Sequence, residues 1–272
     1  KGKDHVHNMN THDVTVNGHT ISYGDLYKET CRQTWHIVTV DGRNGFVTEY
    51  PGGVIARVFV IYKDRSSDDD AGCRVIVEYR SGDCFEWDCR RLGVYNRQFG
   101  VSVSDDGTLV FAQSWEQGLQ AFDAKSGARV WRSAGKTGVT TVYVNADTVL
   151  TCQHEKALQL LDIRTGEVLK ERKPVNDFGF YILKDGYILC HTRARTWEII
   201  RTVDLETVET IPAKLFPDCC IRRITLTAPG TLHVHGFRNV WDDTCTPPKM
   251  LPNEEYDADI AVDPDKIPDK MT

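Results

Sequence analysis

Histidines and cysteines are the residues of this chain whose types and spacing could bind a metal ion. His233 and His235 lie two apart in an alternating apolar run, so both imidazoles would point to one face of a strand and could share an ion. His5, His7 and His12 could do the same near the first residue. Packing or an ordinary hydrogen bond is the commoner role of a strand histidine, and no two cysteines have the Cys-x-x-Cys spacing of a zinc site. We therefore predict neither a metal ion nor a cofactor.

The chain also lacks the short motifs that mark common catalytic sites. It contains no Gly-x-Ser-x-Gly elbow, no His-Glu-x-x-His pair and no glycine-rich phosphate loop. A catalytic triad is assembled in space rather than in sequence, so an enzyme with its site in a central channel of the fold stays open as an alternative. The missing motifs favour a protein that is not an enzyme, and we predict no catalytic residues.

The element that must position any site is a turn that recurs at intervals near forty residues. Its two clearest copies are Asp123-Ala124-Lys125-Ser126-Gly127 and Asp162-Ile163-Arg164-Thr165-Gly166, each between two apolar runs. Asp and Ser or Thr accept hydrogen bonds from nearby backbone N–H groups, and glycine adopts the positive φ that such a turn needs. The signature therefore predicts a β-hairpin turn in each repeat. One acidic anchor per repeat gives a series of six: Asp41, Glu78, Asp123, Asp162, Asp204 and Asp242.

Short β-branched and aromatic runs separate these turns and predict four strands in each repeat, for example at 108–112, 148–151 and 187–190. Four-stranded antiparallel units of about forty residues in series are the sequence form of a β-propeller. We predict an all-β fold, a single β-propeller of four-stranded antiparallel blades. Six blades are expected, with five and seven as the alternatives.

One propeller would use nearly all of the 272 residues. We expect a flexible N-terminal segment at 1–12, the propeller over 13–257 and an acidic, disordered C-terminal tail at 258–272. Segment 23–35 is expected to form an insertion helix in the first blade, although it also resembles the helix that follows an F-box in propeller-type ubiquitin-ligase receptors. The blades are expected near 13–51, 52–95, 96–133, 134–173, 174–214 and 215–257.

The clearest repeat, at 121–131, resembles a motif of a known protein family. Ala121, Asp123, Ser126, Gly127 and Trp131 together resemble the tryptophan-docking motif of quinoprotein-like propellers, which carry pyrroloquinoline-quinone repeats. The resemblance is strongest over 96–173, and a Trp-Asp pair at 241–242 also hints at WD repeats. It implies that the small residue and the tryptophan of neighbouring blades pack together, so that these residues and Asp162, Thr165 and Gly166 are structural.

Some quinoprotein alcohol dehydrogenases carry a disulfide between adjacent cysteines beside the cofactor, and this chain has the pair Cys219-Cys220. Those enzymes are exported and about twice as long. The sequence also shows no matching set of cofactor-binding or calcium-binding residues. The resemblance is therefore expected to concern the repeat, and no quinone cofactor is predicted.

The repeat alignment also indicates which loops share a face. Loops between the second and third strands of successive blades are expected on one face, together with the connections from the fourth strand of one blade to the first strand of the next. The tight repeat turns are expected on the other face. The first face is rich in Trp, Arg and Phe, which are common at interface hot spots, and loops on a rigid scaffold commonly carry binding residues. The alternative is that the aromatic rings pack back onto neighbouring blades. The predicted protein-binding residues are Trp115, Glu116, His154, Arg193, Arg195, Trp197, Phe237 and Arg238.

Charge and composition narrow the class of partner. The formal net charge of −6 argues against nucleic-acid binding, which needs a basic face, and fits a partner with a basic surface. No apolar run reaches the length of a membrane span, so no membrane association is expected. The nine cysteines are an odd number and several lie in apolar runs, which favours a reducing compartment and a cytoplasmic protein.

These properties predict a non-enzymatic protein-binding propeller, an adaptor or substrate-receptor scaffold that is a monomer or a subunit of a hetero-complex. A bacterial immunity or inhibitor protein that binds a basic toxin is an alternative within the same class. A propeller enzyme is an alternative from another class. A periplasmic assembly scaffold is a further one, and it would need a lipidated cysteine near the N-terminus.

Overall fold

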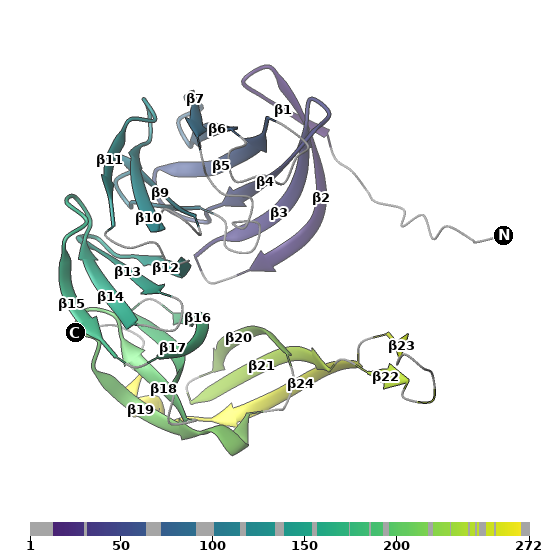
Figure 1. Cartoon of the computed structure of the whole chain (residues 1–272), viewed down its shortest axis with the longest axis vertical. Coiled ribbons are helices and arrows are strands. Elements are labelled where there is room, and N and C mark those ends of the chain that lie inside the picture. Colours follow the sequence, from purple (N-terminus) through teal and green to yellow (C-terminus); the bar gives the residue numbers. More distant parts are fainter. Residues whose placement is uncertain are drawn as a thin grey trace. The chain divides into compact units, whose positions relative to one another are not determined.

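The structure is a computed structural model of the chain, and it divides into two compact units, 1–136 and 137–272 (Figure 1). Each unit is described by itself. Almost every element is a β-strand, every strand pairing is antiparallel, and two short 3₁₀ helices, η2 (Ala213–Leu215) and η3 (Pro264–Lys266), complete the described elements. The structure describes residues 13–29, 32–63, 72–90, 101–114, 118–133, 139–153, 157–173, 175–184, 186–192, 196–216, 220–228, 230–238, 240–242, 244, 249–252 and 254–267.

In the described part of the first unit, the strands form a sheet of seven in chain order and a sheet of four. The seven are β1 (Asp13–Val16), β2 (His19–Glu29), β3 (Thr34–Val40), β4 (Arg43–Glu49), β5 (Ile55–Tyr62), β6 (Gly72–Tyr79) and β7 (Cys84–Arg90). The four are β8 (Ser102–Val103), β9 (Leu109–Ser114), β10 (Gly118–Asp123) and β11 (Arg129–Arg132).

Both faces of the seven-stranded sheet are apolar, since alternate residues of its strands point to opposite sides. One face carries a cluster from Val16 through Phe59 to Ile76. The other face, with Val58, Val75 and Trp87 among others, packs against β9 and β10 of the second sheet. Contacts from the β1–β2 turn to Glu86 on β7 show that the sheet curls until its first and last strands meet.

The two blades expected at 13–51 and 52–95 are not separate sheets. β4 pairs with β5 from Gly45↔Ile61 to Glu49↔Arg57, so both ranges belong to one continuous sheet. Gly45 permits this approach, because a side chain there would collide with the Val60 carbonyl oxygen. The blade boundary expected near residue 51 is wrong for this reason.

The insertion helix expected at 23–35 is also wrong. β2 runs through Glu29, and β3 begins at Thr34 as its antiparallel partner. In β3, Val38 and Val40 are buried and lie two apart, and Thr39 between them is less buried. A period of two fits a strand, and the β-branched residues of this segment favour one.

The described residues of the second unit form sheets of four, four, three and two strands. The two sheets of four are β12 (Val139–Val144), β13 (Thr148–Gln153), β14 (Ala157–Asp162), β15 (Val168–Arg172), and β16 (Val175–Lys184), β17 (Tyr187–Thr192), β18 (Thr196–Arg201), β19 (Thr207–Pro212). The three-stranded sheet is β20 (Cys220–Ala228), β21 (Thr231–Arg238), β24 (Glu254–Ala261), and the pair is β22 (Trp241–Asp242), β23 (Lys249–Met250). Antiparallel sheets of four strands in chain order confirm the predicted fold class, whereas the number of blades stays a prediction.

The repeat turns at Asp123 and Asp162 have the bonds that the sequence predicts. The Asp123 carboxylate accepts hydrogen bonds from the Ser126 N–H and hydroxyl, both at 2.7 Å, and Asp162 accepts from the Thr165 N–H at 2.8 Å. The φ angles of Gly127 and Gly166 are +69° and +73°. These bonds hold the pKa of both carboxyl groups below the ordinary value, with the Ser126 and Thr165 backbone N–H groups as the largest causes.

The next anchor is Arg201 and not Asp204. Leu205 N–H donates to the Arg201 carbonyl at 2.9 Å, which is the bond that Gly166 makes to Asp162. Asp204 takes the place of Thr165, because its carboxylate accepts from the Glu206 N–H and also pairs with the Arg201 side chain. With this correction the three anchors are 39 residues apart.

Other members of the anchor series are not repeat turns. Asp41 and Gly42 form a two-residue turn with φ of +48° and +77°, Glu78 lies inside β6, and Asp242 lies in β22. Strand β24 crosses the expected end of the propeller at 257, and Ile260, Val262 and Ile267 join a buried cluster. Residues 258–267 of the expected disordered tail are therefore a strand, a 3₁₀ turn and part of the core.

Candidate functional sites

Three of the eight predicted binding residues lie in the described part of the chain. Trp197 is the second residue of β18, and Phe237 and Arg238 end β21. The other five lie outside the described residues: Trp115, Glu116, His154, Arg193 and Arg195. Cys219, His5, His7 and His12 lie outside them too, and so does the side chain of Cys220.

An aromatic cluster surrounds Trp197. Its indole stacks on Phe216 with ring centroids 4.4 Å apart and planes at 21°, and the rings of His191 and Tyr181 follow at 4.9 and 6.0 Å. Phe216 is buried beneath, while Trp197 stays partly exposed. The ring therefore does pack on its neighbours, as the alternative reading of the sequence expects, and yet keeps a surface toward solvent.

Leu215, close to this cluster, and Arg238, at the end of β21, are exposed side chains. The Arg238 guanidinium lies 4.9 Å from the centre of the Tyr256 ring, which is cation–π geometry. Leu215, next to Phe216, is 50% exposed. Tyr181 links the two parts, because its hydroxyl donates to the Ile221 carbonyl at 3.5 Å and Ile221 lies opposite Gly236 on β21. We call this set the aromatic corner: Tyr181, His191, Trp197, Leu215, Phe216, Phe237, Arg238 and Tyr256.

Tryptophan docking occurs in the first unit, but through a residue that the motif did not identify. Trp87 of β7 stacks on Phe122 of the next sheet at 5.5 Å, and its indole N–H donates to the Ala124 carbonyl at 3.1 Å. The motif residue Trp131 instead lies opposite Ala121 on the neighbouring strand and near Phe111. Trp87 follows the glycine of the β6–β7 turn, Gly82, by five residues, much as Trp131 follows Gly127 by four, and that spacing is the signal that could have identified it.

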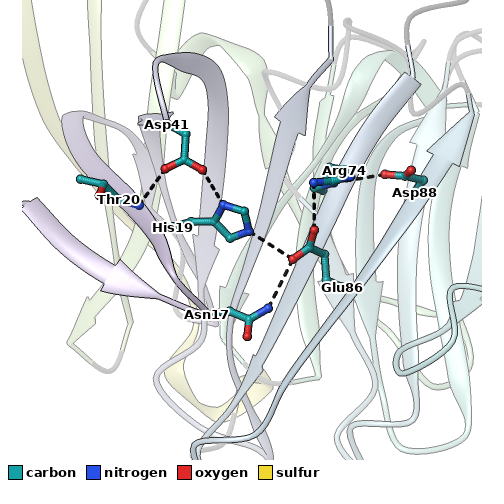
Figure 2. A network of polar contacts seen from close by, with 7 residues as sticks. All are labelled: Asn17, His19, Thr20, Asp41, Arg74, Glu86 and Asp88. Carbon is teal, nitrogen blue, oxygen red and sulfur yellow. Dashed lines mark hydrogen bonds and ion pairs between the residues drawn. The ribbon is translucent and has the colours of Figure 1, made fainter.

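A polar network that no motif indicated joins the ends of the curled sheet (Figure 2). His19 Nδ1 lies 2.5 Å from an Asp41 oxygen, and His19 Nε2 lies 3.1 Å from Glu86. Asn17 also donates to Glu86, at 3.3 Å, and Arg74 pairs with its other oxygen at 3.1 Å. The Asn17-Gly18 and Asp41-Gly42 turns bring these side chains together at one end of the sheet.

Beside this network lies a pocket of ≈ 170 Å³. The Asp41 bond is the main cause that raises the pKa of His19. None of the described lining residues is a Ser, Thr or Cys, so within the described part of the chain the pocket offers no hydroxyl or thiol nucleophile. The lining residues are His19, Val40, Asp41, Arg43, Ile61 and Arg74.

The pH dependence of the first unit follows from His19. A raised pKa means that charged His19 adds its full stability below the ordinary histidine pKa of about 6.5, and that this stability is lost as the pH rises through the higher folded value. We expect amide hydrogen exchange of the β1–β2 hairpin, corrected for intrinsic rates, to lose protection between pH 6 and 8 in the native chain, by an amount worth less than about 1 kcal/mol. The same change in His19→Gln would contradict this role.

The cysteines that the structure describes also argue against nucleophilic chemistry. The described cysteine side chains are the thiols of Cys73, Cys84, Cys89, Cys152 and Cys190. Burial raises the pKa of Cys73 to about 12 and that of Cys190 well above its ordinary value. A thiol with a raised pKa is protonated at neutral pH and is a poor nucleophile.

The described ranges contain neither a metal-binding cluster nor a membrane-spanning helix. Within them, no group of three or more His, Cys, Asp or Glu side chains is arranged to hold a metal ion. His233 and His235 do point to one face of β21, and each faces carboxylates of β24. No helix of the described chain has the length and hydropathy to cross a membrane.

Comparisons with known proteins complete the description. No protein-family model matches this chain, and no curated protein matches its sequence. Among solved structures, the C-terminal WD40 domain of Sif2 matches with a TM-score of 0.43 and 11% sequence identity. The match covers 68% of this chain and 54% of the WD40 chain, so this chain spans about half the length of that structure.

Proposed function

We propose that this chain is a non-enzymatic protein-binding scaffold and that it binds its partner through the aromatic corner. The observation that carries the proposal is the Trp197 ring, which is held by stacking on buried Phe216 and yet keeps an exposed surface. A ring fixed before binding loses little conformational entropy when a partner covers it. Interface hot spots are commonly such tryptophans, with arginine nearby.

The rigid strands beneath the corner support this use. Trp197 and Phe237 lie at strand ends, and the strands beneath them contribute Ile199, Leu232 and Val234 to one buried cluster. The partner is expected to present an apolar group to Trp197. The net charge of −6 favours a partner with a basic surface, and we place the complex in the cytoplasm.

A photocrosslinking amino acid, placed in turn at two exposed positions, tests which face of the protein contacts the partner. Leu215 lies in the corner, and Val203, 42% exposed, lies in the turn at the opposite end of β18. In cell extract, we expect a specific crosslinked protein from position 215 and none from position 203. Crosslinks from 203 alone would place the binding face at the repeat turns and overturn the proposal.

Trp197→Ala then measures the contribution of the ring. With the crosslinked partner purified, we expect the affinity to fall at least about tenfold, because a hot-spot truncation costs more than about 1.4 kcal/mol. The control is Leu169→Ala, which removes an apolar side chain that is 56% exposed on β15, outside the aromatic corner. Unchanged affinity in a folded Trp197→Ala protein would contradict the role of this ring.

A further inference from the structure

One face of β21 and β24 carries five titratable side chains in a row of alternating charge type. His233 lies 2.8 Å from Asp259 and 3.1 Å from Asp257. His235 lies 2.9 Å from the same Asp257 oxygen and 3.4 Å from Glu255. The order along the sheet is therefore Asp259, His233, Asp257, His235, Glu255, and we call it the histidine row.

All the histidine–carboxylate contacts of the row can be hydrogen bonds only when both histidines are charged. A neutral imidazole donates from one nitrogen, whereas both nitrogens of each ring face carboxylate oxygens. On the other side of β21, Arg223 and Thr225 of β20 lie opposite His235 and His233, so Arg223 is a further charged residue beside the row. His235 is the first cause that holds the pKa of Asp257 below its ordinary value.

The two halves of β24 are held differently. Its C-terminal half is anchored by Ile260, which is buried in the core of the unit. In its N-terminal half, 254–258, the inward residue Tyr256 remains partly exposed. Without charge on the histidines, three carboxylates would follow each other on one face of this edge strand, at every second residue.

The N-terminal half of β24 also supports the aromatic corner. Glu255 pairs with Phe237 and Glu254 with Arg238 in the strand register, and Tyr256 lies beneath the Arg238 guanidinium. The position of these corner residues therefore depends on how firmly 254–258 stays on β21.

We propose that the histidine row is a protonation-dependent clamp that holds residues 254–258 on β21 and thereby positions Phe237, Arg238 and Tyr256. Because both nitrogens of each ring face carboxylate oxygens, charged histidines close the clamp and neutral histidines loosen it, so that alkaline pH is expected to weaken it. Its effect on partner binding rests on the function proposed above, while the clamp itself needs no partner.

Amide hydrogen exchange of the full chain tests the clamp. In the native protein, protection of peptides from 254–258, corrected for intrinsic exchange, is expected to fall roughly five- to tenfold between about pH 5.5 and 8, the scale of a few partly exposed ion pairs. Protection at 260–262 should change less. A pH-independent exchange of 254–258 in the native chain would overturn the proposal without any variant.

Two double variants separate the clamp from general effects of pH. In His233→Gln/His235→Gln, protection of 254–258 should be low and independent of pH, and in His233→Lys/His235→Lys it should stay high at pH 8. His36→Gln, in the first unit, is the matched control and should behave like the native chain. A native pH response retained in the Gln double variant would overturn the clamp, whereas failure of the Trp197 test would overturn the binding function alone.

Discussion

Gly127→Ala is expected to destabilise the first unit by about 2–5 kcal/mol. The φ of +69° costs an alanine about 1–2 kcal/mol, and the new methyl group would lie 2.5 Å from the Trp87 ring. Trp87 is buried and cannot move aside without losing its stacking on Phe122 and its bond to the Ala124 carbonyl, so overpacking adds about 1–3 kcal/mol. Urea unfolding followed by circular dichroism measures the loss.

Gly42→Ala is the matched control for this prediction. Gly42 has a φ of +77°, and a methyl group there would meet no atom within 4 Å. It should therefore cost only the backbone term of about 1–2 kcal/mol. Equal losses in the two variants would show that the Trp87 contact does not contribute.

At position 205, glycine is expected to give a more stable protein than alanine, which is the reverse of the usual order inside a helix or strand. Leu205 is buried, yet its φ is +59°, at the position that glycine occupies in the turns at Gly127 and Gly166. Leu205→Ala loses the buried side chain and keeps the backbone strain, which should cost about 2–5 kcal/mol. Leu205→Gly loses the same packing and relieves about 1–2 kcal/mol of strain, so it should be the more stable of the two.

Urea midpoints of the two Leu205 variants, with hydrogen exchange at 196–212, provide the measurement. Leu158→Ala and Leu158→Gly serve as the control pair, because Leu158 is fully buried inside β14. There glycine should be the worse residue by about 0.5–1 kcal/mol. A Leu205→Gly protein less stable than Leu205→Ala would show that the turn does not strain the native residue.

Local chemistry explains which parts of the fold could be predicted. The turns at Asp123 and Asp162 are made by hydrogen bonds among residues three or four apart, so the local sequence is sufficient to predict them. The turn at Arg201 has the same backbone bonds with Asp, Thr and Gly replaced by Arg, Asp and Leu. At this turn the backbone hydrogen bonds of the repeat and the burial of Leu205 outweigh the preference for glycine at a positive φ. The sequence signature therefore placed the anchor at Asp204, three residues after Arg201.

In the candidate sites, too, the sequence predicts the local features but not the contacts between distant segments. The alternation in β21 predicts that His233 and His235 share a face, but the acids that face them come from β24, beyond the β22–β23 pair. Trp197 could be singled out by its type and its place after a loop. Its packing on Phe216 could not, because that contact depends on how the chain returns after β19.

By itself, the sequence determined the strands near 108–112, 148–151 and 187–190, their antiparallel order within the repeats, and the turns at Asp123 and Asp162, whose hydrogen bonds are local. Only the tertiary structure decided that β4 continues into β5, that Trp87 docks on the turn at Gly127, and that His19 bridges Asp41 and Glu86. The reason is the distance along the chain between the partners. Periodicity and turn chemistry act over a few residues, whereas these contacts join residues whose approach is set by the packing of whole sheets.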